Sequence, residues 1–435
     1  MEDENDEAAR RRFGRRGFLA AGASSAVAAG GYFATRDAGD EPRAQIPGSE
    51  YANLSTFLLA AHPPAVRAAI ERHRRGLDGD TALYLREHEE ELESEARAAA
   101  AEHLGAEADD VALTDSTTMG LALVYGGLRL APGDDVVTTE HDFYATHESL
   151  RLRAERDGVS VRRVQLYDVP EEATADRIVS TIAGALGPRT RALALTWVHS
   201  SSGVKLPLRE IATAVADANR GRGDRERILL CVDGVHGFGV EPESPVELGA
   251  DVFVSGCHKW LFGPRGTGIV WAAPHVWDRI APLIPSFDAR AYVAWLEGRA
   301  PGDVPPGPLM TPGGFHSFEH RWALPQAFEH HAALGGPAEI ARTTYALAAR
   351  MKQGLAEIPG MRVKTPADAA LSSGLVCAVI PKLPAGQIVD ALREEHQVIA
   401  TVTPYVWQYV RFGPSVLNDE GDVDRALEAV AAVVA

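Results

Sequence analysis

Short apolar runs and helical patterns alternate along most of this chain. Stretches such as residues 208–218, in which apolar residues recur at helical spacing, separate many of the runs. Buried strands that alternate with helices are typical of a mostly parallel sheet that is covered on both faces. The pattern therefore predicts an α/β protein with a strand at each of seven runs: residues 111–114, 136–139, 160–166, 192–198, 228–232, 252–254 and 268–271.

A change of pattern near Pro337 divides the chain, because longer helical stretches replace the short strands. We therefore expect a large domain at residues 51–335 and a smaller C-terminal α+β domain at residues 336–435. In the smaller domain the pattern predicts helices at residues 338–357, 385–395 and 422–434, and a strand at residues 374–380.

Two further stretches are assigned from their composition. Residues 81–104 form a strongly charged helical pattern, and we interpret its Glu-rich run, residues 87–95, as a solvated helix face. The Gly- and Pro-rich stretch at residues 301–308 is predicted to be a loop.

Residues 1–36 do not fit the alternation and are predicted to lie outside the fold. Residues 15–19, Arg-Arg-Gly-Phe-Leu, precede a mildly apolar Ala- and Gly-rich run, and the segment resembles a twin-arginine export signal. The resemblance implies recognition by the twin-arginine export machinery and an exported, periplasmic or extracytoplasmic location. A disordered basic arm or an uncleaved anchor is the alternative, as is a cytoplasmic location. Residues 37–50 contain Pro and Gly and are predicted to be a linker.

Composition and charge exclude several classes of protein. The chain has 435 residues, with 43 Lys and Arg against 60 Asp and Glu, and a formal net charge of -17. An acidic surface argues against nucleic acid or an anionic membrane as the main partner. Three scattered cysteines are too few for a disulfide framework or a Cys-rich zinc site, and we expect no metal site.

Polar residues follow several predicted strands, at the strand ends where ligands bind in open α/β sheets. Thr117 and Thr118 open an apolar helix, and they are either a plain helix cap or an anion site. His141 is either a surface residue or a flat stacking partner for a ligand. Asp233 closes an apolar strand, where it is either a helix cap or the charge partner of a cation in the cleft.

Lys259 gives the strongest local signal for chemistry. It stands among aromatic and apolar neighbours, in Cys-His-Lys-Trp, just past a predicted buried strand. Burial at such a position lowers the pKa of an amine and makes it a nucleophile. The Gly-Pro-Arg-Gly-Thr-Gly segment at residues 263–268 precedes a strand instead of following one, so it is not a dinucleotide-binding fingerprint.

Together these strand ends supply an anion cradle, a flat stacking residue, a carboxylate and a reactive amine, which is the set that pyridoxal phosphate requires. With these residues the chain resembles the class V aminotransferase family of fold type I pyridoxal-phosphate enzymes, over nearly the whole of residues 51–435. The resemblance is greatest to its isopenicillin N epimerase-like and cysteine desulfurase-like branches. It implies pyridoxal 5'-phosphate as cofactor, a homodimer and a small amino-acid-like substrate.

The resemblance also implies a role for each residue that matches the family pattern. Lys259 is expected to bind the cofactor covalently, and Asp233 to keep the ring nitrogen protonated. Arg411, in Val-Arg-Phe-Gly-Pro-Ser, is expected to hold the substrate α-carboxylate as a bidentate fork, with a surface ion pair as the alternative. The other implied contacts are Thr117, Thr118 and His258 at the phosphate, His141 on the ring face, and His236 near the ring hydroxyl.

The chain departs from the family pattern at three places. Ser200 stands in a loop where the family often has Asn, so it is only a candidate ring contact. The segment at residues 318–322 lacks the Thr that desulfurase-like members extend to the partner's phosphate, and Arg321 is offered as a substitute or as a second substrate anchor. Residues 400–410 lack the catalytic Cys of desulfurases, and Cys377 is predicted to be core, so a cysteine desulfurase is disfavoured.

We therefore expect a pyridoxal-phosphate enzyme that acts at the α-carbon of an amino acid. Lys259 is the expected general base. Transamination or epimerisation ranks first, with Tyr144 or His147 as guesses for the second acid that epimerisation needs. A β-eliminating C–S lyase ranks second, and an exported protein that keeps the fold without catalysis is the third alternative.

Overall fold

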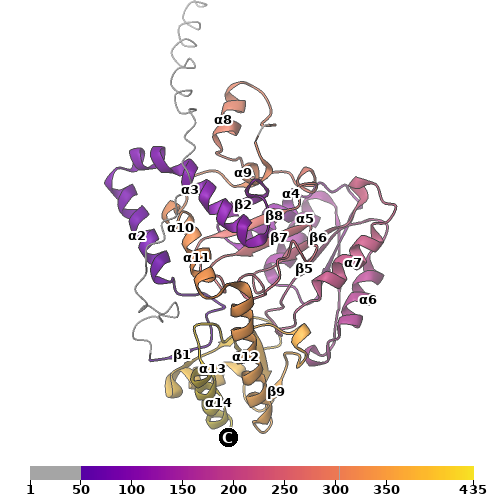
Figure 1. Ribbon diagram of the computed structural model, residues 1–435. Helices are drawn as coiled ribbons and strands as arrows, with labels where there is room; N and C mark the ends of the chain where they lie inside the picture. Colours follow the sequence, from indigo (N-terminus) through magenta and orange to yellow (C-terminus); the bar gives the residue numbers. More distant parts are fainter. Residues whose placement is uncertain (1–49, 303) are drawn as a thin grey trace, which may run out of the picture. The chain divides into compact units, whose positions relative to one another are not determined.

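A computed structural model describes residues 50–302 and 304–435, and the larger part of these residues is built on one seven-stranded sheet (Figure 1). The twin-arginine segment and residues 37–49 of the expected linker lie outside the described residues. The strand order is β2-β8-β7-β6-β5-β3-β4, in which β8 runs antiparallel to both of its neighbours and the other pairs are parallel. The mostly parallel seven-stranded α/β sheet is therefore confirmed. Its strands are β2 (Val111–Thr114), β3 (Asp135–Thr139), β4 (Ser160–Val164), β5 (Thr190–Thr196), β6 (Leu229–Asp233), β7 (Val252–Gly256) and β8 (Gly268–Ala272).

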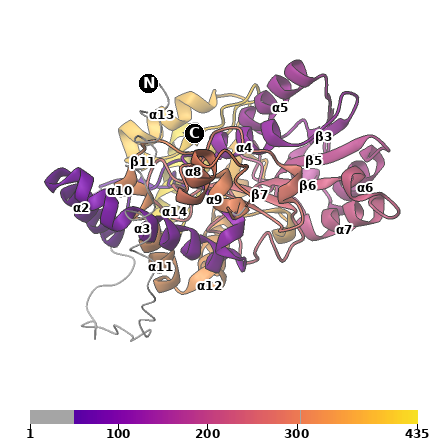
Figure 2. The ribbon, with the colours of Figure 1, turned by 90° about the horizontal axis from the view of Figure 1, so that it is seen from above.

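Alternate residues of each central strand enter different hydrophobic clusters, one on each face of the sheet. In β5, Leu193 and Leu195 belong to one cluster, whereas Ala192 and Ala194 belong to the other. This follows from the period of two in a strand, and it explains why the buried strands read as continuous apolar runs. Figure 2 shows the strands between α5 on one side and the α6–α7 pair on the other. The helices that cover the two faces are α4 (Thr117–Gly127), α5 (Tyr144–Asp157), α6 (Ala175–Ala185) and α7 (Leu208–Ala218).

A second group of helices packs against the β2 end of the large sheet. The long charged helix α3 was correctly predicted, but Glu93 within its Glu-rich run has a side chain that is only 13% exposed, because it pairs with Arg321 and His316. The expectation of a solvated face was therefore wrong at that residue. We also expected a loop at residues 301–308, but this prediction was wrong at its C-terminal end, because α9 begins there. The elements are α2 (Pro64–Gly79), α3 (Thr81–Leu104), α8 (Ala289–Leu296), α9 (Pro306–Met310), α10 (Phe318–Arg321) and α11 (Pro325–Ala333).

The C-terminal residues form an antiparallel sheet of order β12-β13-β10-β9, whose core is shared with three helices. The N-terminal strand β1 joins this part, because it pairs in parallel with β11 and places Ala52 and Leu54 in the same core. Whether the chain divides into domains at residue 336 stays a prediction. The elements are β1 (Ala52–Asn53), α12 (Gly336–Glu357), β9 (Arg362–Val363), β10 (Val376–Val379), α13 (Ala385–His396), β11 (Val398–Ile399), β12 (Thr401–Val402), β13 (Val410–Phe412) and α14 (Glu420–Val434).

Short 3₁₀ turns complete the described structure. Among residues 50–302 and 304–435, no helix has both the length and the apolar character that a membrane crossing requires. The turns are η1 (Ala108–Asp110), η2 (Pro170–Glu172), η3 (Asp224–Glu226), η4 (Trp277–Arg279) and η5 (Ala369–Leu371).

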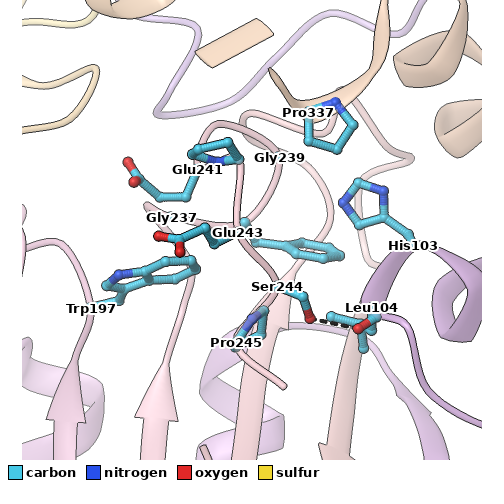
Figure 3. Close-up of a pocket in the computed structure, with 12 residues that line it drawn as sticks. His103, Leu104, Trp197, Gly237, Gly239, Glu241, Glu243, Ser244, Pro245 and Pro337 are labelled. Carbon is cyan, nitrogen blue, oxygen red and sulfur yellow. Dashed lines mark hydrogen bonds between the residues drawn. The ribbon is translucent and has the colours of Figure 1, made fainter. Parts of the chain in front are cut away.

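The buried carboxylate of Glu241 joins the segment after β6 to α12 and to the residues before β10. Its Oε2 accepts hydrogen bonds from Tyr345 at 2.6 Å and from the amine of Lys205 at 2.9 Å, and its Oε1 accepts one from Ser373. A buried carboxylate with three donors compensates its lost hydration. Figure 3 shows the pocket beside Glu241, whose lining includes Trp197 and His103 but none of the candidate catalytic residues.

Candidate active site

Asp233 closes β6, and its carboxylate is buried at the end of the large sheet. Burial raises its pKa to about 6, whereas the Val235 N–H, which donates to Oδ1 at 3.1 Å, and the nearby Lys259 both lower it. Asp233 is therefore ionised above about pH 6, but its buried carboxylate has lost the stabilisation that water would give. A cationic partner in the site reduces this desolvation cost. The structure brings Asp233 and Lys259 close enough to shift each other's pKa.

Lys259 lies on a tight loop that directly follows β7. The loop is closed by the Gly263 N–H, which donates to the Cys257 carbonyl at 2.8 Å, and by the Phe262 N–H, which donates to the Lys259 carbonyl at 3.0 Å. Phe262 is buried and has a φ of 59°, a left-handed conformation whose strain is about 1–3 kcal/mol in a residue other than glycine. The packed surroundings hold this strain, so the base of the lysine side chain is fixed.

The amine of Lys259 lies 3.2 Å from Nε2 of His236. Burial and, secondarily, the charge of Arg411 lower the pKa of Lys259 to about 8, although Asp233 opposes the shift. Burial also lowers the pKa of His236, so this imidazole is neutral and can accept from the amine. The Nδ1 of His236 is buried and has no partner among the described residues, so it is available to a ligand.

The N-terminus of α4 provides an anion cradle beside this pair. Ser116 is the actual N-cap, because its Oγ accepts from the Met119 N–H at 3.1 Å. The N–H groups of Thr117 and Thr118 belong to the first turn, where the helix offers no acceptor and the helix dipole favours an anion. The hydroxyl of Thr117 accepts from the Gly256 N–H at 2.8 Å, which fixes the cradle to the end of β7.

Gly256 also brings His258 to this cradle. A Cβ at Gly256 would lie 2.8 Å from Cε1 of His258 and 3.0 Å from Oγ1 of Thr117. The two side chains therefore converge over a position that only glycine leaves open. The predicted grouping of Thr117, Thr118 and His258 is consistent with this geometry.

Arg411 lies on β13 with a buried guanidinium that no carboxylate of the described residues pairs with. Its Nε donates to Oγ1 of Thr401 at 3.1 Å, and its Nη1 donates to the Ser200 carbonyl at 2.9 Å. Two neutral acceptors position the fork without neutralising it. Within the part of the chain that the structure describes, the surface ion pair considered as the alternative does not occur, and a bound carboxylate would supply the missing charge.

Ser200 lies at the Arg411 end of the site. Its hydroxyl is 2.7 Å from the hydroxyl of Tyr405, in the turn between β12 and β13. The rings of Tyr405 and Phe143 meet edge to face at 6.2 Å. These contacts place aromatic side chains between Arg411 and the start of α5.

The ring of Phe57 packs against the guanidinium of Arg411, a role that no pattern in the sequence indicated. The buried ring lies 4.7 Å from the guanidinium carbon of Arg411 and 6.2 Å from the ring of His236. A Cβ at Gly413 would lie 2.2 Å from Cδ1 of Phe57, so glycine is required beside the arginine for the ring to fit. The cation–π contact compensates a buried charge that has no acid partner.

His141 is partly buried at the end of β3, where one face of its ring stacks on Tyr167. Neither Tyr144 nor His147, the two residues suggested as a second acid, is held toward the site. Tyr144 is 69% exposed, and the Nε2 of His147 is 2.8 Å from the Thr139 carbonyl and is thus committed to the backbone. The structure therefore supports neither of them as the second acid.

Arg321 is buried, but the structure does not bring it to the Lys259–His236 pair. Its Nη2 donates to Asp115 at 3.0 Å, and its Nη1 lies 3.5 Å from Glu93. Two carboxylates already balance its charge, so a second substrate anchor is not supported. Asp115 directly precedes the cap of α4, and Arg321 therefore holds the chain that enters the anion cradle.

Comparison with known proteins agrees with this geometry. The family model "Aminotransferase class-V" matches residues 64–403. An isopenicillin N epimerase from Streptomyces clavuligerus is 26% identical over 85% of this chain and 92% of its own length. An L-cysteine desulfhydrase-like protein from Epichloe uncinata is 28% identical, but the match covers 54% of this chain and half of that protein. A solved cystine C–S lyase in complex with cysteine persulfide superposes with a TM-score of 0.77 at 21% identity, over 88% of this chain and 98% of the lyase, which shows the shared fold.

The lowered pKa of Lys259 predicts unusual amine reactivity in the cofactor-free protein. Only a neutral amine attacks an acylating reagent, so labelling of Lys259 should rise with pH around a midpoint near 8 instead of 10.5. Because the negative charge of Asp233 raises this pKa, Asp233→Asn should move the midpoint to lower pH. Peptide mass spectrometry across pH 6–11 measures both midpoints, and an unshifted wild-type midpoint near 10.5 would refute the prediction.

Replacing the ring under Arg411 should weaken substrate binding and leave the cofactor in place. Phe57→Leu keeps an apolar side chain but removes a desolvated cation–π contact of about 1–2 kcal/mol, so the Kd of an amino-acid ligand should rise about 5- to 30-fold. The matched control is Leu58→Ala at the neighbouring position, where the side chain is 53% exposed. Equal effects of both substitutions on ligand binding, measured by titration of the holoenzyme, would contradict the assigned role.

Proposed function

This chain belongs to the class V aminotransferase family and is a pyridoxal-phosphate-dependent enzyme, and from that premise we propose that it acts at the α-carbon of an amino acid as an aminotransferase or an epimerase. The observation that carries the proposal is the buried Arg411 fork, which lacks a carboxylate among the described residues. It lies close enough to Lys259 to shift that pKa. A substrate with an α-carboxylate and an α-amine fits this pair of groups.

The residues fit the cofactor at each of its polar ends. The Lys259 amine would bind the aldehyde of the cofactor, and the buried Asp233 carboxylate would pair with its protonated ring nitrogen. The first turn of α4, with Thr117, Thr118 and His258, is matched to the phosphate. The buried Nδ1 of His236, which has no partner in residues 50–302 and 304–435, independently indicates that a polar ligand group completes the site.

When bound, the cofactor withdraws electrons from the substrate α-carbon. Arg411 binds the α-carboxylate with the donors that Thr401 and Ser200 leave free, and so it orients the Cα–H bond. Lys259, whose lowered pKa leaves part of the amine neutral near pH 8, takes and returns the α-proton. Asp233 supplies negative charge opposite these cations, and burial of the site excludes water from the exchanged proton.

A second group is needed to deliver a proton from another side in epimerisation. His141 is better placed than Tyr144 or His147 to hold a ligand group on that side by a hydrogen bond, because the Leu166 N–H binds only its Nε2, and its Nδ1 has no partner among the described residues. The similarity to an isopenicillin N epimerase over most of both chains favours this outcome, although 26% identity does not transfer the substrate.

A β-eliminating C–S lyase is the second candidate. It is supported by the partial similarity to an L-cysteine desulfhydrase-like protein. Cysteine desulfurases are also among the relatives, but the turn between β12 and β13 carries aromatic residues and no thiol. Cys377 is buried in β10 and burial raises its pKa, so it is not a nucleophile of the site.

We also propose that the enzyme is a homodimer that is exported in its folded state. Large apolar side chains on and near α8 are exposed, and exposed apolar surface of this kind is typical of an interface. Export is supported by the Arg-Arg-Gly-Phe-Leu sequence at residues 15–19, and cell fractionation tests it. The exposed apolar side chains are Leu283, Ile284, Phe287, Tyr292, Trp295, Leu296 and Phe315.

Exchange of the α-proton in deuterated water tests the proposed chemistry even while the substrate is unidentified. The holoenzyme should exchange the α-proton of at least one member of an amino-acid panel. Loss of optical rotation then identifies an epimerase, keto-acid formation an aminotransferase, and sulfide release a lyase. Absence of exchange across the panel, with the cofactor bound, would refute all three activities.

Arg411→Lys should raise the KM for the exchanged amino acid about 10- to 100-fold, because a charge-assisted hydrogen-bonded pair contributes about 1.5–3 kcal/mol and lysine cannot form the fork. The control is Arg425→Lys, since Arg425 donates to the backbone carbonyls of His396, at the C-terminal end of α13, and of Glu50. An unchanged KM in Arg411→Lys would remove the observation on which the proposal rests.

A further inference from the structure

The loop after β5 buries a histidine that the proposed mechanism does not use. His199 is fully buried, and its backbone closes the loop through the Gly203 N–H, which donates to the His199 carbonyl at 2.8 Å. Its Nδ1 lies 2.8 Å from the hydroxyl of Tyr167, which is also 3.0 Å from Oγ of Ser202. His199 and Ser202 are thus two buried polar partners of one phenol.

Tyr167 in turn supports the ring of His141. The two rings are stacked, with centroids 3.8 Å apart and planes inclined by 16°. Tyr167 is itself buried, and the hydroxyl at one end of its ring is fixed by His199 and Ser202. The ring therefore forms a fixed platform for one face of His141 and leaves the opposite face for a ligand.

The residue before Tyr167 fixes one nitrogen of the same imidazole. The Leu166 N–H donates to Nε2 of His141 at 3.2 Å, so this nitrogen acts as the acceptor. Burial lowers the pKa of His141 to about 3, and the imidazole is therefore neutral. Its single ring proton must then lie on Nδ1. A flip of the ring would break the Leu166 bond, and a tilt would break the stack.

We propose that Tyr167, held by His199 and Ser202, is a positioning residue that fixes the ring plane and the Nδ1–H tautomer of His141. Nδ1 then presents its N–H as a hydrogen-bond donor to a bound ligand, and the use of this donor in the reaction rests on the proposed function. The His-Ser-Ser-Ser-Gly loop, in which the chain departs from the family pattern, acquires a role through His199 and Ser202. The phenol keeps both partners whichever of them accepts its proton.

Two substitutions separate the platform from its support. Tyr167→Leu removes the stacked ring, whereas Tyr167→Phe keeps the ring and removes only the hydroxyl that His199 and Ser202 hold. The control is Tyr84→Leu, because Tyr84 contacts His88 and His73 in the α2–α3 pair and no candidate catalytic residue. All variants are compared as holoenzymes for α-proton exchange and for thermal stability.

Tyr167→Leu should lower kcat for exchange about 10- to 100-fold and change KM by less than about 3-fold, as for other residues that orient a catalytic group. Tyr167→Phe should give a smaller loss of kcat in the same direction. Tyr84→Leu should lower Tm without lowering kcat. A kcat that is unchanged in Tyr167→Leu, or that falls equally in Tyr84→Leu, would overturn the proposal.

Nitrogen-15 NMR of the histidine side chains provides a readout that needs no substrate. In the wild type, with and without cofactor, the resonances that His141→Gln removes should report a neutral ring with the proton on Nδ1. Tyr167→Leu should replace them by averaged tautomer signals. A wild-type Nε2–H tautomer, or an unchanged tautomer in Tyr167→Leu, would contradict the inference. If the wild type shows no exchange with any amino acid, the proposed function fails, and this NMR result still decides the tautomer.

Discussion

The active site depends on two buried cations, Lys259 and Arg411, for which the described residues supply no ion-pair partner. Lys259 and Arg411 lie within electrostatic reach of each other, and among the residues that the structure describes Asp233 is the acid whose charge acts on Lys259. Desolvation lowers the pKa of both cations and raises that of the acid. This lack of partners is unfavourable in the protein alone, and an anionic cofactor and a substrate carboxylate relieve it. The burial that destabilises these unpaired cations in the protein alone therefore also favours the binding of an anionic ligand.

The fold delivers these charges from distant parts of the sequence. The large sheet contributes Asp233 and the Lys259 loop at neighbouring strand ends, whereas Arg411 belongs to the small antiparallel sheet. The N-terminal segment connects the two, because β1 pairs with β11 and Phe57 lies under Arg411 beside His236. Glu241 also ties the segment after β6 to α12, because Tyr345 donates a hydrogen bond to its carboxylate.

Most of the sheet and the strand-end residues could be predicted from the sequence. Buried strands leave an apolar run, and the residue that ends such a run has a defined place at the sheet edge, as Asp233 and Thr117 have. Helix patterns likewise located α3 and α7 at their observed bounds. Contacts between residues that lie far apart in the sequence leave no such pattern. Phe57 and Tyr167 look like ordinary core residues, and Glu93 looks like one more exposed acid of its helix.

Lys259 is expected to hold the cofactor covalently. Reduction of the holoenzyme with borohydride, followed by peptide mass spectrometry, measures this most directly. We predict that the mass of the reduced cofactor is found on the peptide that carries Lys259, and that Lys259→Ala does not acquire it. Attachment to a different lysine, or a wild-type protein that binds no cofactor, would contradict the account.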